Sequence, residues 1–134
     1  MGVHFNLNVQ IVEDNAVNQQ LVQRVVTNLG CHWTTAANGR IALDQLSLAT
    51  PDVVLMDLHM PEMDGLTAIK KIRAGEAGEA ARGVWIAALT ADARPEQRER
   101  TLNAGANDYL AKPVRLPDVM AALERYVSST KKMG

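Results

Sequence analysis

The stretch VVLMDLHMPEMDG, residues 53–65, begins with an apolar run that has the length and composition of a buried strand. The run stops at Asp57 and passes into a loop that holds a proline, two further acids and a glycine. Burying a charged group is costly unless the group is paired, so a buried strand that ends in a carboxylate needs a reason. The stretch therefore predicts a strand in a covered sheet and a polar site at the end of that strand.

Apolar runs of this kind alternate with stretches of helical periodicity along the chain. Strands are predicted at 7–13, 31–36, 51–57, 84–90 and 107–111, and helices at 14–30, 38–49, 65–74, 94–105 and 116–129. Asp14 or Asn15 is expected to cap the first helix, and residues 129–134 are expected to form a polar tail. Strict alternation of strand and helix predicts an α/β fold with a parallel sheet and helices on both faces.

Composition narrows the class of protein. The chain has 134 residues, enough for one domain with a core, and 14 basic against 15 acidic residues give a formal net charge of -1. This balance gives no reason to expect direct binding to nucleic acid. No apolar run is long enough to span a membrane, and the first residues lack the pattern of a signal peptide. The single Cys31 cannot form an internal disulfide, so we expect a cytoplasmic protein without direct membrane contact.

Polar residues follow or end four of the predicted strands. Glu13 ends the first strand and Asp14 follows it, Asp57 ends the third, Thr90 ends the fourth and Lys112 follows the fifth. In open α/β sheets the ligand site lies beyond these carboxyl ends. Carboxylates brought close together repel each other, and a hard divalent cation such as Mg²⁺, Mn²⁺ or Ca²⁺ relieves that conflict. The hydroxyl and the ammonium suit phosphate oxygens, and an aspartate beside a metal can act as a nucleophile.

Four motifs carry a family resemblance, namely VEDN (12–15), DLHMPEMDG (57–65), LTA (89–91) and DYLAKP (108–113). In this order and at this spacing they resemble the receiver domains of two-component response regulators, and the likeness extends from about residue 7 to residue 128. The resemblance implies one flavodoxin-like, doubly wound domain over residues 1–134. It also implies the strand order 2-1-3-4-5, which is the known order of flavodoxin-like proteins that include members of this family.

The resemblance implies a phosphoacceptor that promotes its own phosphorylation and dephosphorylation. Asp57 would accept a phosphoryl group from a phosphohistidine. Mg²⁺, or Mn²⁺ in its place, would be held by Glu13, Asp14, Asp57 and the backbone carbonyl of His59, with Glu13 acting through a water molecule.

The resemblance also implies a conformational switch. Thr90 and Lys112 would bind the phosphoryl group after transfer, and Ala91 is small where that group must enter. Tyr109, three residues before Lys112, would change its side-chain position together with Thr90. The Lys112–Pro113 peptide bond would be cis.

A partner surface is predicted on the first helix. One stripe of that helix should face the sheet, and it contains Asn18, Val22, Val25, Val26 and Leu29. Val17 lies outside the stripe and forms an apolar shoulder with Leu21, four residues later. We expect Val17, Leu21 and Pro113 to dock a helix that carries the phosphohistidine, in a histidine kinase or a histidine phosphotransfer domain.

The stretches EDNAVNQ (13–19) and GANDYLAKPV (105–114) resemble receivers of hybrid histidine kinases, and a stand-alone regulator is the alternative. A haloacid-dehalogenase-type phosphatase needs a second aspartate where His59 stands. A flavodoxin-like cofactor binder needs a phosphate-binding loop, whereas residues 13–18 are acidic and contain no glycine. A degenerate receiver that serves only as a docking module stays open.

Other residues have simpler interpretations. A zinc site formed by His59 with His32 and Cys31 is disfavoured, because the strand that carries the last two should place them at the far end of the sheet. Trp33 and Trp85 are expected to pack in or near the core.

Overall fold

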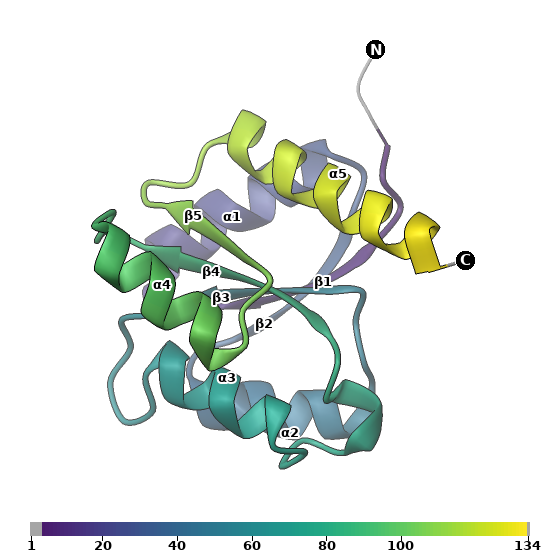
Figure 1. Ribbon diagram of the computed structural model, residues 1–134. Helices are drawn as coiled ribbons and strands as arrows, with labels where there is room; N and C mark the ends of the chain where they lie inside the picture. Colours follow the sequence, from purple (N-terminus) through teal and green to yellow (C-terminus); the bar gives the residue numbers. More distant parts are fainter. Residues whose placement is uncertain (1–3, 134) are drawn as a thin grey trace.

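The computed structural model describes residues 4–133, which contain a five-stranded parallel sheet with helices on both faces (Figure 1). Its elements are β1 (Asn8–Val12), α1 (Ala16–Asn28), β2 (His32–Ala36), α2 (Gly39–Leu48), β3 (Val53–Asp57), α3 (Gly65–Arg73), the 3₁₀ turn η1 (Glu79–Ala81), β4 (Trp85–Thr90), α4 (Pro95–Ala104), β5 (Asp108–Ala111) and α5 (Leu116–Met133). The order β2-β1-β3-β4-β5 confirms the expected topology.

Each face of the sheet has its own apolar core. Helices α1 and α5 cover one face, and α2 and α3 cover the other together with the end of α4 (Figure 1). Strand β3 is buried at every position because its alternate side chains enter opposite cores. Val53 and Leu55 pack towards α1 and α5, while Val54 and Met56 pack towards α2 and α3. Asp57 thus ends a strand that is covered on both sides.

Two helix ends differ from the sequence prediction in ways that have simple causes. The cap of α1 is Asn15, whose Oδ1 accepts a hydrogen bond from the backbone N–H of Asn18 at 3.0 Å. Asp14 is therefore left out of the cap. Helix α5 continues to Met133, beyond the predicted end at 129, because no glycine or proline interrupts residues 118–133. Within residues 4–133, no helix combines the length and the apolar content that crossing a membrane requires.

The two tryptophans lie in different surroundings. Trp85 is half-buried beside the α1/α5 core, and its ring meets that of Tyr126 edge to face at a centroid distance of 5.8 Å. Trp33 is 40% exposed, and its Nε1 donates to Oγ1 of Thr27 at 2.9 Å. The expected packing holds for Trp85 and is wrong for Trp33, because β2 is an edge strand with an incompletely covered face.

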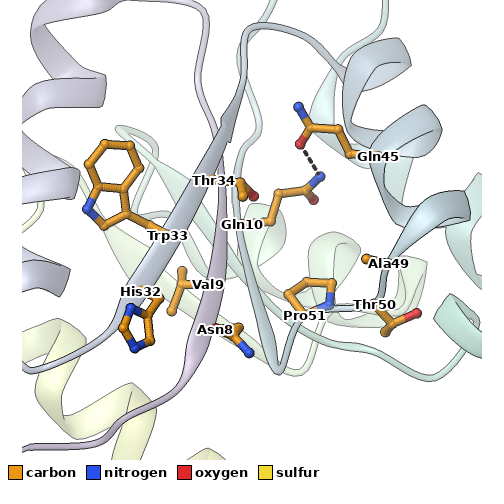
Figure 2. A pocket seen from close by; sticks show the side chains of 10 residues that line it. All are labelled: Asn8, Val9, Gln10, His32, Trp33, Thr34, Gln45, Ala49, Thr50 and Pro51. Atoms are coloured by element: carbon orange, nitrogen blue, oxygen red, sulfur yellow. Dashed lines mark hydrogen bonds between the residues drawn. The ribbon is translucent and has the colours of Figure 1, made fainter.

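A hollow of about 430 Å³ lies beside β2, at the end of the sheet opposite the strand ends that carry the predicted site residues (Figure 2). Gln45 of α2 reaches across it. The Nε2 of Gln45 donates to the backbone carbonyl of Thr35 at 2.9 Å, and its Oε1 accepts from Nε2 of Gln10 at 3.1 Å. In β2, the backbone N–H of His32 and the carbonyl of Ala36 bond to the β1 side. The backbone N–H and carbonyl groups of the odd-numbered residues 33 and 35 therefore point away from β1, and Gln45 hydrogen-bonds to one of these carbonyls, that of Thr35.

Candidate functional site

The parallel sheet brings the predicted acidic residues to one edge. Glu13 follows β1 and Asp57 ends β3, and these strands are neighbours with Val12 opposite Met56. Carboxylate oxygens of Glu13, Asp14 and Asp57 lie within 4.8 Å of one another. Both Glu13 and Asp57 are 1% exposed, whereas Asp14 is exposed. The structure therefore groups two buried carboxylates with one that solvent reaches.

Lys112, which follows β5, partly neutralises this group. Its Nζ lies 3.0 Å from Oδ1 of Asp57 and 3.2 Å from Oε1 of Glu13. Burial acts to lower the pKa of Lys112, but the hydrogen bonds and charges of Asp57 and Glu13 outweigh it and raise that pKa. The ammonium therefore stays charged and links two strands across the site. The Lys112–Pro113 peptide bond is cis, as the resemblance implies.

One ammonium does not satisfy both carboxylates. Oε1 of Glu13 is buried with only the ion pair to Lys112, and Oδ2 of Asp57 is buried with no hydrogen-bond partner or ion pair among the described residues. Burial raises the pKa of Glu13 to about 7; a hydrogen bond from the Asn15 N–H opposes that rise, and the neighbouring Asp57 adds to it. Buried oxygens without partners are rare in native proteins and call for a ligand. Oxygen ligands in this arrangement fit a hard divalent cation.

Gly65, at the start of α3, lies directly against the end of β3. A Cβ at this position would stand 2.3 Å from the backbone oxygen of Asp57 and 2.7 Å from Cα of Leu58. These are backbone atoms and cannot rotate away. The glycine in the opening stretch is therefore required by the close approach of α3 to Asp57.

We expect Gly65→Ala to lower the free energy of unfolding by about 2–3 kcal/mol, because overpacking against rigid atoms costs about this much. Gly83→Ala is the matched control, since a Cβ there meets nothing within 4 Å, and it should change stability by less than about 0.5 kcal/mol. Urea unfolding of both variants measures the difference. Equal stability of the two would show that α3 can move away from β3.

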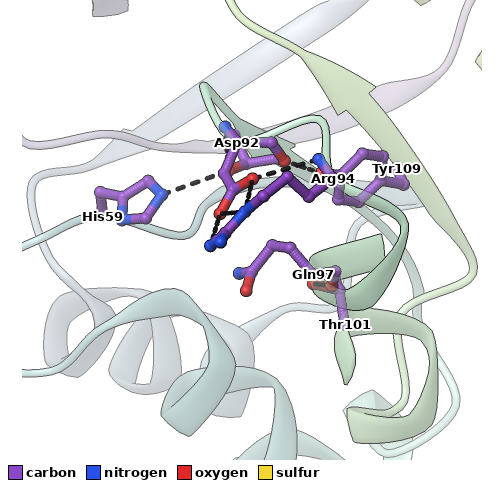
Figure 3. A network of polar contacts seen from close by, with 7 residues as sticks. His59, Asp92, Arg94, Gln97, Thr101 and Tyr109 are labelled. Carbon is purple, nitrogen blue, oxygen red and sulfur yellow. Dashed lines mark hydrogen bonds and ion pairs between the residues drawn. The ribbon is translucent and has the colours of Figure 1, made fainter. Parts of the chain in front are cut away.

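Thr90 ends β4 and is fully buried, and its hydroxyl belongs to a second polar network that includes His59 and Asp92 (Figure 3). Its Oγ1 lies 3.2 Å from Nε2 of His59 and accepts a hydrogen bond from the backbone N–H of Asp92 at 3.0 Å. The hydroxyl of Tyr109 donates to the backbone carbonyl of Asp92. The sequence linked Thr90 with Tyr109 but did not predict the contacts of Thr90 with the His59 side chain and the Asp92 backbone, since neither contact has a sequence signal.

Two of the three predicted docking residues, Leu21 and Pro113, lie next to the acidic group. Val17 is 73% exposed and Leu21 is 38% exposed. Leu21 and Pro113 line one hollow together with Glu13 and Lys112, whereas Val17 stands outside its lining. Among residues 4–133, Glu13, Asp14 and Asp57 form the only group of at least three side chains with metal-ligating geometry. No zinc cluster of His59, His32 and Cys31 is therefore present in that part of the chain.

Comparison with known proteins identifies a family. The family model of the response regulator receiver domain matches residues 9–124. The hybrid signal transduction histidine kinase H of Dictyostelium discoideum is 35% identical over 128 residues, which cover 92% of this chain and 9% of that protein. The chain therefore spans less than a tenth of the length of this relative.

Solved structures agree with this match. The receiver domain of the sensor histidine kinase PA1611 from Pseudomonas aeruginosa, with magnesium in its active-site cleft, has a TM-score of 0.82 and 38% identity, covering 92% of this chain and 98% of that one. A chain from the complex of the Saccharomyces cerevisiae phosphotransfer protein Ypd1 with the receiver domain of Ssk1 has a TM-score of 0.83 and 30% identity, covering 92% and 90%.

Proposed function

Because the chain belongs to the response regulator receiver family, we propose that its Asp57 accepts a phosphoryl group from a phosphohistidine. The buried carboxylate of Asp57 carries this proposal. Its Oδ1 is held by Lys112 and by the backbone N–H of His59, and its Oδ2 has no hydrogen-bond partner within residues 4–133. One oxygen is thus fixed, and the other keeps its lone pairs for attack.

The transfer follows from this arrangement. Oδ2 of Asp57 forms a bond to phosphorus while the bond from phosphorus to the imidazole nitrogen breaks, and the electron pair of that bond stays with the leaving imidazole. Lys112 is positioned to neutralise charge on the phosphoryl oxygens. The product is an acyl phosphate at the end of β3.

The acidic group fits Mg²⁺, with Mn²⁺ as a substitute. Glu13, Asp14, Asp57 and the backbone carbonyl of His59 would hold the ion. The close grouping of the three carboxylates, which one ammonium only partly neutralises, supports this assignment. When bound, Mg²⁺ neutralises charge on the transferring phosphoryl group. The magnesium-containing receiver of PA1611 supports the same choice of ion.

We further propose that Thr90 and Tyr109 form the switch. In the acyl phosphate the Thr90 hydroxyl would turn to a phosphoryl oxygen, and Tyr109 would move into the space that Thr90 leaves. The buried position of Thr90 at the end of β4, next to β3, supports this role. A haloacid-dehalogenase-type reaction has no comparable support, since the comparisons place the chain among receivers.

The proposed test of function uses the whole chain with Mg²⁺ and acetyl phosphate. We expect an increase in mass equal to one phosphoryl group, lost on treatment with hydroxylamine and located by peptide mapping in the segment that contains Asp57. Omitting Mg²⁺ should prevent the increase. A phosphate that resists hydroxylamine, or one placed on another peptide, would contradict the assignment.

The proposed donor is a helix of a histidine kinase or a histidine phosphotransfer domain. The Ypd1–Ssk1 complex shows that a receiver can pair with such a protein. The likeness to hybrid kinases favours an origin within a longer kinase chain, with a stand-alone regulator as the alternative. A cytoplasmic setting remains the prediction from the sequence.

We expect Val17→Glu to slow transfer from a protein donor about tenfold or more, equivalent to about 1.4 kcal/mol, because it places a charge on the apolar docking shoulder. Val17 is exposed, so folding and phosphorylation by acetyl phosphate should not change. Gln20→Glu adds the same charge to another exposed position of α1 and serves as the control. Equal rates from the protein donor in both variants would place the docking surface elsewhere.

A further inference from the structure

The switch proposed above requires the Thr90 hydroxyl to turn towards Asp57, yet the structure shows that hydroxyl engaged elsewhere. It is 3.2 Å from Nε2 of His59 and 3.0 Å from the backbone N of Asp92. In the proposed switch, both contacts would break as Thr90 turns to a phosphoryl oxygen. We propose that the His59 side chain is a positioning residue that holds the switch in its resting form, an inference that rests on the proposed function.

The backbone N–H and carbonyl of Asp92 extend this hold to Tyr109. The N–H donates to Thr90, and the carbonyl accepts from the Tyr109 hydroxyl. The Asp92 carboxylate is in turn held by Arg94, whose Nη2 lies 2.7 Å from Oδ2 and whose Nε lies 2.9 Å from Oδ1 (Figure 3). We call His59, Thr90, Asp92 and Tyr109 the resting latch. Releasing Thr90 therefore also disturbs the anchor of the Tyr109 ring.

Breaking the contacts of the resting latch should cost little free energy. His59 is exposed, so water can replace Thr90 at its ring nitrogen, and the net loss is that of one ordinary hydrogen bond. The segment that must move leads into α4, whose buried residues are the polar Gln97 and Thr101. Little apolar surface therefore fixes this helix. A hold of this strength can bias a two-state equilibrium without preventing the transition.

The first test measures the binding of beryllofluoride, which forms an analogue of the acyl phosphate at the aspartate. The titration is carried out in saturating Mg²⁺, and the amide NMR signals of residues 90–92 report the binding. His59→Leu removes the ring nitrogen, and we expect half-saturation at about fivefold lower beryllofluoride, the equivalent of one hydrogen bond. His59→Gln keeps a polar group near the same reach and should stay within about twofold of the wild type. The control His32→Leu removes an exposed histidine at the opposite end of the sheet and should have no effect. Unchanged or weaker binding by His59→Leu would overturn the latch.

The second test needs no phosphorylation chemistry. A double-mutant cycle in urea unfolding combines His59→Leu with Thr90→Val, which removes the hydroxyl and keeps the shape. We expect His59→Leu to destabilise the protein when Thr90 is present and to have no effect in the Thr90→Val background. Equal effects in both backgrounds would overturn the contact. If the wild type and His32→Leu both ignore beryllofluoride, the proposed function fails, and this cycle still decides the latch.

Discussion

Asp57→Asn protein is expected to take up at least about a hundredfold less covalent phosphate than the wild type, from acetyl phosphate or from a protein donor. Asparagine keeps the shape of the side chain, but its amide is not a nucleophile. The variant also removes one of two buried carboxylates that repel each other, so its free energy of unfolding should equal or exceed that of the wild type. Loss of labelling together with undiminished stability identifies a chemical role.

Asp44→Asn is the control for this experiment. Asp44 lies on the exposed surface of α2, where it pairs with Arg40 at 3.7 Å, and its replacement removes the same charge far from the site. It should label like the wild type. Normal labelling of the Asp57 variant, measured by phosphoprotein electrophoresis and intact mass, would remove the central claim of the proposed function.

Asp14→Ala is expected to weaken Mg²⁺ binding about thirtyfold, equivalent to about 2 kcal/mol, whereas Glu13→Gln should weaken it only a few-fold. Asp14 is exposed, and no hydrogen bond or ion pair engages its carboxylate within the described residues. Glu13 already accepts a hydrogen bond from the Asn15 N–H and faces Lys112. Asp14 is thus free to bind the ion directly, while Glu13 is better placed to act through water.

Calorimetric titration with Mg²⁺ measures both variants. Glu62→Gln removes an exposed acid from the loop after β3 and tests whether loss of nearby negative charge alone weakens binding. It should change the affinity less than about twofold. Undiminished Mg²⁺ affinity in Asp14→Ala would show that other groups bind the ion. Equal losses of affinity in all three variants would show that the loss of negative charge, and not the loss of a ligand, weakens binding.

The sequence predicted the arrangement of the sheet because its signals are local. A wholly apolar run such as 53–56 requires burial on both faces, and Asp57 is conspicuous directly after it. Parallel strands then bring their carboxyl ends to one edge, so the meeting of Glu13 and Asp57 follows from topology. The strand order itself came from the family resemblance and not from local signals.

What the sequence could not predict depends on side-chain direction. The approach of His59 to Thr90 joins residues 31 positions apart across two loops, and no periodicity encodes it. The exposure of Trp33 follows from the edge position of β2, which the strand pattern alone does not reveal. Asp14 and Asn15 were equal candidates for the cap of α1 because both side chains can accept the same hydrogen bond.

The Gln45 side chain has a consequence for solubility. An open sheet edge offers unpaired backbone groups to a strand from another molecule, which is a route to aggregation. Gln45 occupies the outward carbonyl of Thr35, and the indole of Trp33 is tied back to Thr27. An incoming strand would find the outward carbonyl of Thr35 already hydrogen-bonded. By occupying this acceptor, Gln45 of α2 should disfavour the pairing of β2 with a strand from another molecule.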